Sequence, residues 1–212
     1  MNKNEKFVIV INRELGSGGH TIGRLLAEKL GVKYHDKAVI SGLEEDFNLT
    51  KEEIERLKGT KNDWWDIICR FMQIGPGMSG ELGITYKPDG SGVLTADDIF
   101  AAETEILKNL GSGESCVIAG RLGFHVFREH PNHMSIFIQA SMPFRIKRLM
   151  SKQNMTEEEA RTVIEKIDEM RETYVKKYAK TSRYDTRNYD LVITADGKKE
   201  EEIAEYILQF LE

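Results

Sequence analysis

Short apolar runs recur along the chain and alternate with longer segments of helical periodicity. The runs are rich in β-branched residues and lack the alternation of a half-exposed strand, which is the pattern of a strand buried on both faces. The expected strands, including a shorter candidate that ends in an acid, lie near 7–12, 33–35, 116–120, 135–140 and 190–194. Because strands that alternate with helices build parallel sheets, the pattern predicts an α/β fold: a five-stranded parallel sheet with helices on both faces.

The helical segments carry recognisable ends. After the first strand, apolar residues repeat at helical spacing up to Leu30, and Gly31 follows where a C-cap glycine belongs. Thr156 and Glu159 form a capping box that opens a long helix towards Ala179. An amphipathic helix closes the chain. Between the second and third expected strands, the sequence predicts a short helix at 48–58 and an apolar helix with Trp64 and Trp65. A glycine-rich loop or hairpin at 75–92 follows, which we interpret as part of an insertion.

The sequence NRELGSGGHTIG at 12–23 places a glycine cluster between a buried strand and the start of a helix. Glycine allows backbone N–H groups to converge on an anion, and the N-terminus of the next helix adds unpaired donors and a positive dipole end. We therefore predict a phosphate-binding loop. Its residues are Gly16, Ser17, Gly18, Gly19, His20 and Thr21. The alternative is a tight turn that needs small residues only for steric reasons.

The loop departs from the usual P-loop, which reads GxxxxGK followed by Ser or Thr. Gly19 stands where the Lys is expected, and His20 where the first hydroxyl is expected. Thr21 could still hold a metal ion through its hydroxyl. Arg13 or Arg24 could supply positive charge, although Arg24 is more simply explained as an exposed charge on the helix surface.

Further candidate residues follow the ends of strands or lie on the later helices. Asp36 could face the same crevice as the loop, because ligands collect at the carboxyl ends of parallel strands, or it could cap a following helix. Arg121 leaves a strand end poised to bind a phosphate, or else pairs with a neighbouring acid. The remaining arginines could form a cationic cluster over the crevice or a solvated helix face: Arg145, Arg148, Arg161 and Arg171.

The composition argues against some classes of partner but does not identify the function. The formal net charge is −5 and no long basic run occurs, so the electrostatic footprint of a double-stranded nucleic acid partner is missing. No stretch approaches a membrane span and the N-terminus does not resemble a signal peptide, so we expect a cytoplasmic protein. Cys69 and Cys116 belong to no Cys/His cluster, and we interpret both as unpaired thiols.

The chain resembles the cytidylate kinases, and more closely the cytidylate kinase-like family, whose phosphate loop has the sequence RExGSGGxxIG. The matching segments cover nearly the whole chain outside the Trp-containing insertion. They are RELGSGGHTIG at 13–23, LAEKLGVKYHD at 26–36, VIAGRLG at 117–123, SIFIQASMPFRIKR at 135–148, TEEEARTVIEKIDEMRETY at 156–174 and NYDLVIT at 188–194. The resemblance implies a three-layer P-loop kinase fold over residues 1–212, with a monophosphate-binding or insertion region at about 37–94 and a helical LID at about 150–187.

The resemblance also implies roles for residues. Gly16 to Thr21 would bind ATP, with Thr21 on Mg²⁺, and Asp36 and Arg121 would bind a nucleoside monophosphate. Cationic residues would surround the transferred phosphoryl group, namely Arg13, Arg145, Arg148 and Arg171. The implied reaction is ATP plus CMP, dCMP or a similar acceptor giving ADP and the diphosphate. Leu122 departs from the family's GRDxG segment, in which an Asp occupies this place.

Two other interpretations stay open from the sequence. One is a non-catalytic nucleotide-binding or regulatory protein that kept the crevice and lost the chemistry. The other is a kinase for a different small phosphate acceptor. In each case the partner is a small molecule, neither nucleic acid nor membrane is expected, and the sequence leaves the oligomeric state open.

Overall fold

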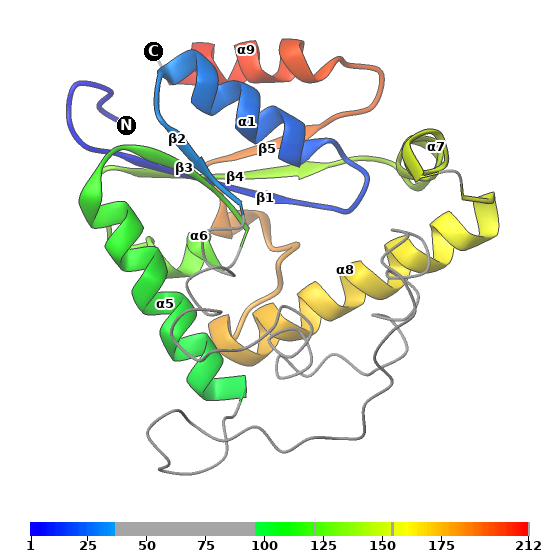
Figure 1. Cartoon of the computed structure of the whole chain (residues 1–212), viewed down its shortest axis with the longest axis horizontal. Helices are drawn as coiled ribbons and strands as arrows, with labels where there is room; N and C mark the ends of the chain where they lie inside the picture. The colour runs from blue at the N-terminus through cyan, green and yellow to red at the C-terminus, as the bar shows by residue number, and fades with distance from the viewer. Residues whose placement is uncertain (37–95, 121, 154, 212) are drawn as a thin grey trace. The chain divides into compact units, whose positions relative to one another are not determined.

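The computed structural model describes residues 1–36, 96–120, 122–153 and 155–211 (Figure 1). The predicted helices and glycine-rich loop between residues 37 and 95 lie outside these ranges, as does Arg121. The chain divides into two compact units, one formed by Met1–Asp36 with Leu107–Glu212 and the other by Lys37–Ile106. The sheet belongs to the first unit.

The sheet has five parallel strands in the order β2-β3-β1-β4-β5, which confirms the predicted fold class. The strands are β1 (Val8–Arg13), β2 (Lys33–His35), β3 (Cys116–Ala119), β4 (His133–Gln139) and β5 (Leu191–Thr194). β1 lies in the centre, where Ile11 pairs with Ala119 of β3 and Arg13 pairs with Ile138 of β4. The C-terminal end of β1 is therefore flanked by strand ends on both sides, where ligands of open α/β sheets bind.

Burial on both faces of the sheet explains why the first four residues of strand β1 are all apolar. Ile9 and Ile11 point into the main hydrophobic core and are fully buried. Val8 and Val10 point to the opposite face and are equally buried, with Val10 against Gly123. A strand covered on both faces cannot place a polar side chain at either set of alternate positions, so no polar alternation appears in its sequence.

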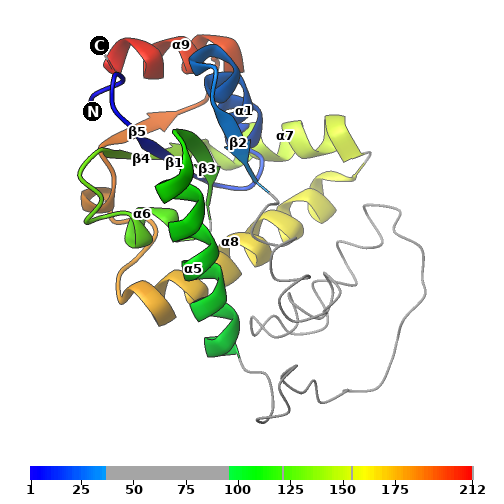
Figure 2. The ribbon, with the colours of Figure 1, turned by 60° about the vertical axis from the view of Figure 1, so that its left-hand side comes forward.

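Helices α1 (Gly19–Leu30) and α9 (Glu200–Phe210) lie side by side on one face of the sheet (Figures 1 and 2). Ile22 and Leu26 of α1 and Ile203 of α9 are buried in the same core cluster. The expected C-cap is present: Gly31 has φ 66° and donates its N–H to Glu28 O over 3.2 Å.

The opposite face of the sheet is covered in part by α6 (Gly123–Val126), a short helix that the sequence analysis did not predict (Figure 1). A Cβ on Gly123 would lie 2.7 Å from Val10 Cγ1, so glycine lets this helix approach β1 closely. A longer helix, α5 (Ala96–Gly113), precedes β3.

Two helices pack against each other before and within the region at about 150–187 that was expected to form the LID. They are α7 (Met142–Gln153), with Pro143 in its first turn, and α8 (Glu157–Ala179). The predicted capping box is confirmed, since Thr156 accepts the Glu159 N–H over 3.3 Å and Glu159 accepts the Thr156 N–H over 2.8 Å. A 3₁₀ turn, η1 (Thr186–Asn188), then leads into β5.

Candidate active site

The predicted phosphate loop connects β1 to α1. Gly16 and Gly18 both have left-handed backbone, with φ of 83° and 88°. Gly18 is the N-cap of α1 and offers no side chain, and Ile22 N begins the helical ladder by donating to Gly18 O over 3.1 Å. Within the described part of the chain, the first-turn N–H groups of α1 have no side-chain cap, so they are oriented to receive an anion.

Helix α7 packs against the loop and holds it in place. A Cβ on Gly16 would lie 2.9 Å from both Arg145 O and Leu149 Cδ1, so only glycine permits this approach. Ser17 is buried and directs both its N–H and its Oγ to Glu14 O, over 3.3 and 3.0 Å. The Ser17 N–H is therefore bonded within the loop and not directed to a ligand, which differs from the prediction for this residue. The loop itself is fixed by its own carbonyl and by a helix before any ligand arrives.

Three predicted residues meet beside the loop. Arg13 Nη2 lies 3.2 Å from Asp36 Oδ1, and His20 Nε2 lies 2.9 Å from Asp36 Oδ2. Arg13 ends β1, Asp36 follows β2, and His20 is in the first turn of α1. The structure therefore brings these side chains together at the carboxyl ends of the strands, as the sequence analysis expected for Asp36.

A buried carboxylate connects the loop to α7 and to the segment that follows α8. Asp168 of α8 accepts a hydrogen bond from Leu15 N over 3.2 Å and another from Arg183 Nη1 over 3.2 Å. Its second oxygen accepts from Arg145 Nη1. The Asp168 side chain is only 8% exposed, so its charge is neutralised by these arginines in a poorly hydrated site.

The other predicted arginines lie around the same loop and differ in how buried they are and in their ion-pair partners. Arg145 is buried, and its Nε lies 3.7 Å from Glu14 Oε2 in addition to the pair with Asp168. Arg171 is 36% exposed and donates to Arg13 O over 3.3 Å. Arg148 Nη1 lies 2.5 Å from Glu200 Oε1.

Arg148 also approaches the loop itself. Its Cζ would be 3.5 Å from a Cβ placed on Gly18, so the guanidinium borders the N-terminus of α1. Arg161, in contrast, is 48% exposed and is placed 3.7 Å from Glu157 on its own helix, which matches the solvated-face alternative.

Asp168, Arg183 and Glu14 were not proposed as site residues from sequence. Arg183 is 4% exposed and reaches back over 2.5 Å to Arg13 O, the carbonyl that also receives Arg171. The only local signal was the i, i+3 spacing of Asp168 and Arg171 on one helix. Arg183 follows α8 in an irregular segment, and nothing in its surroundings along the chain marks it as buried.

Thr21 occupies the first turn of α1, where a P-loop hydroxyl meets Mg²⁺. Among the residues that the structure describes, no group of three or more His, Cys, Asp or Glu side chains is placed to hold a metal ion. A kinase magnesium site needs fewer protein ligands, because nucleotide phosphates and water supply the rest. Thr21 stays the predicted protein ligand of such a site.

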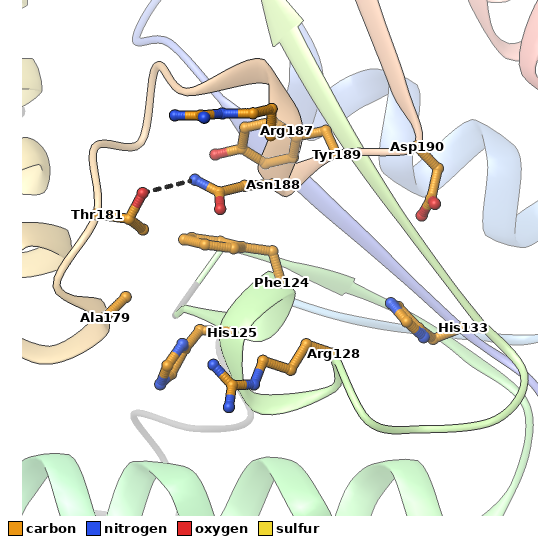
Figure 3. A pocket seen from close by; sticks show the side chains of 10 residues that line it. All are labelled: Phe124, His125, Arg128, His133, Ala179, Thr181, Arg187, Asn188, Tyr189 and Asp190. Atoms are coloured by element: carbon orange, nitrogen blue, oxygen red, sulfur yellow. Dashed lines mark hydrogen bonds between the residues drawn. The ribbon is translucent and has the colours of Figure 1, made fainter.

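A separate cavity of about 390 Å³ lies at the other end of the sheet (Figure 3). Its lining residues are Phe124, His125, Arg128, His133, Ala179, Thr181, Arg187, Asn188, Tyr189 and Asp190. His133 pairs with Val8 at the start of the strands, whereas the phosphate loop follows their carboxyl ends.

Several polar groups of this cavity already bond to the protein. Asn188 Nδ2 donates to Thr181 Oγ1 over 3.3 Å, and Asp190 Oδ2 accepts from Ser135 N over 2.7 Å. Burial, together with the nearby Arg128 charge, lowers the pKa of His125. None of the predicted site residues that the structure describes lines this cavity, so it is separate from the described part of the phosphate loop.

In the described part of the chain, no helix combines the length and the apolar character that crossing a membrane requires. Comparison with curated proteins gives no sequence match. Solved structures of similar fold do exist. An uncharacterized protein from Eubacterium ventriosum is 22% identical with a TM-score of 0.66, covering 97% of this chain and 98% of its own.

Two further structures share the fold at lower similarity. The protein TT1252 from Thermus thermophilus is 18% identical with a TM-score of 0.52, covering 98% of this chain and 96% of its own. A shikimate kinase from Bacteroides thetaiotaomicron is 16% identical with a TM-score of 0.50, covering 97% of each chain. At these identities the likeness supports the P-loop kinase fold and not a particular substrate.

Sequence similarity adds what the fold alone does not. The model of the cytidylate kinase-like family matches residues 8–196, from the start of β1 to just beyond β5. The match contains the phosphate loop, Asp36 and the helices that carry the arginines. The chain therefore belongs to the cytidylate kinase-like family.

Proposed function

We propose that the protein transfers a phosphoryl group from ATP to a nucleoside monophosphate, with CMP or dCMP as the acceptor. The observation that supports this best is the phosphate loop between β1 and α1, whose helix N-terminus has no side-chain cap. Family membership supports a kinase reaction, and the choice of cytidine nucleotides rests on the family resemblance alone.

The proposed roles divide along the crevice. Gly16, Gly18, Gly19 and His20 would present backbone N–H groups to the ATP phosphates, and Thr21 would ligate Mg²⁺. Ser17, whose N–H donates to Glu14 O over 3.3 Å, would hold the loop in shape. The ion would supply charge neutralisation between the phosphates. On the acceptor side, Asp36 and Arg121 would bind the monophosphate.

The arginines complete the site. Phosphoryl transfer needs little covalent chemistry from the protein, so positioning and neutralisation of phosphate charge are its main contributions. Arg148 and Arg171 border the loop and would contact the transferred group directly. Arg145 belongs to the same cationic group, and its pairs with Asp168 and Glu14 also fix the loop on which transfer depends.

The test is formation of ADP from ATP and Mg²⁺ with CMP, dCMP, UMP and unrelated small alcohols as acceptors. We expect turnover that requires a nucleoside monophosphate and is fastest with a cytidine nucleotide. Thermal stabilisation by ATP without acceptor-dependent turnover would instead establish the non-catalytic alternative. Turnover with a different acceptor class would overturn the assignment of substrate and keep the kinase.

A pair of glycine variants separates loop function from general stability. Gly18 and Gly197 both have left-handed backbone, with φ of 88° and 70°, so alanine strains each of them similarly. Only Gly18 belongs to the phosphate loop. We expect Gly18→Ala to weaken ATP binding by at least about 10-fold, and Gly197→Ala to leave it unchanged.

A further inference from the structure

The phosphate loop shows a reciprocal exchange of residues at two positions. In the P-loop pattern GxxxxGK, a glycine opens the loop and a lysine ends it. With Gly18 as the second glycine and Gly19 in the place of the lysine, the opening glycine falls on Arg13. The chain therefore has a cation where the pattern has glycine, and glycine where the pattern has the cation.

The structure shows that the two changes depend on each other. A Cβ on Gly19 would lie 2.5 Å from Arg13 Cβ and 2.9 Å from Arg13 Cγ, well inside contact distance. The stem of Arg13 thus occupies the space through which a side chain at position 19 would leave the helix. Arg13 can adopt this course only because position 19 is glycine.

The far end of the same side chain also requires a glycine. A Cβ on Gly120, which follows β3, would overlap Arg13 Nη1. On its other side the guanidinium is held by Asp36, 3.2 Å from Nη2. The cation therefore crosses the carboxyl ends of β1 and β3, 20% exposed, beside the N-terminus of α1.

We propose that Arg13 supplies the phosphate-binding charge that lysine supplies in other P-loops, delivered from the strand and not from the helix. The inference rests on the proposed function, because it assigns a contact with the nucleotide phosphates. A planar guanidinium suits this task, since its N–H groups match two phosphate oxygens at once. Asp36 orients the fork, and Gly19 and Gly120 provide its path.

The other cation raised by the sequence has a different position. Arg24 is 57% exposed, and its Nη1 is 3.9 Å from Glu28 Oε2 on the same helix. An exposed ion pair of this kind contributes little to stability, and it leaves no reason to assign Arg24 a role in the loop. Arg24→Ala is therefore the matched control: an arginine of α1 is lost and the site is kept.

The experiment compares the wild-type protein with Arg13→Ala, Gly19→Lys, the double variant Arg13→Gly/Gly19→Lys, and Arg24→Ala. Each is measured for unliganded melting temperature, ATP affinity by calorimetry and acceptor-dependent ADP formation. We expect Arg13→Ala to lose about 100-fold in kcat/KM, the scale of a lost charge-assisted contact. Gly19→Lys alone should be destabilised by the clash and inactive.

The double variant gives the decisive result. Restoring the usual glycine and lysine should recover at least about 10-fold of the activity lost in Arg13→Ala, which a purely structural role for Arg13 does not predict. Arg24→Ala should match the wild type. A folded Arg13→Ala protein within about threefold of wild-type activity would overturn the inference while leaving the proposed kinase intact.

Other outcomes also count against the inference. A double variant that melts like the wild type but is no more active than Arg13→Ala would show that lysine at position 19 cannot replace Arg13. If the double variant does not fold, the affinities of Arg13→Ala for ATP and for adenosine decide: a larger loss for ATP supports a phosphate contact, and an equal loss for both refutes it. A wild-type protein that binds no ATP would remove the proposed function and this inference together.

Discussion

The buried carboxylate of Asp168 offers the sharpest test of how the loop is held. Asp168→Asn keeps the shape and an acceptor for Leu15 N but removes the charge that Arg145 and Arg183 share. Both arginines are buried, at 7% and 4% exposure, so the variant leaves uncompensated positive charge in the interior. Breaking a buried ion pair from one side costs about 3–5 kcal/mol. Because Glu14 remains 3.7 Å from Arg145, we expect the lower end, about 3 kcal/mol.

Urea and thermal unfolding measure this loss. For a chain of this size, about 3 kcal/mol corresponds to a decrease in Tm of roughly 6–12 °C and in the urea midpoint of about 1 M. Glu169→Gln is the control, because Glu169 is the exposed neighbour on the same helix and its loss should stay within about 0.5 kcal/mol. A decrease in the free energy of unfolding below about 1 kcal/mol for Asp168→Asn would refute the view that this carboxylate neutralises the buried arginines.

Two further predictions concern the other titratable groups. Burial and the nearby Arg128 lower the pKa of His125, so the unfolded chain binds its proton first and the free energy of unfolding should fall as pH drops from about 7 to about 5. His125→Gln should flatten that slope in urea titrations repeated across pH, and an unchanged slope would contradict the assignment. Burial raises the pKa of Cys116 to about 11 and the thiol is fully buried, so iodoacetamide should label it only after unfolding. Rapid labelling of the native protein, detected by mass spectrometry of the Cys116 peptide, would show that this strand opens.

Much of the fold was predictable because its signals are local. Residues 8–11 of β1 and 136–138 of β4 form continuous apolar runs because both faces of the sheet are covered there. Thr156 with Glu159 satisfies its own helix end within four residues. The helix α6 was missed because four residues carry no periodicity, and Gly123 is explained only by its approach to Val10.

The candidate site was predictable in part. The glycine cluster marked the loop between β1 and α1 for which we propose phosphate binding. The strand-end position predicted that Asp36 would lie beside this loop, and the structure places it 3.2 Å from Arg13. The pairing of Asp168 with Arg183 is a different case, because two charged residues on a helix and in a following loop are usually solvated. Burial reverses that expectation, and burial depends on how α7 and α8 pack.

By itself, the sequence determined the parallel sheet, the glycine-rich loop between β1 and α1, and the family, because each depends on neighbouring residues or on motifs in a fixed order. The tertiary structure decided which charges are buried and that Arg13 is the cation that lies beside the N-terminus of α1. Arg13 and Gly19 are six positions apart, and only the distance of 2.5 Å between the Arg13 stem and the missing side chain shows that one excludes the other. Backbone patterns are local, whereas charge pairing and steric exclusion arise from distances that only packing sets.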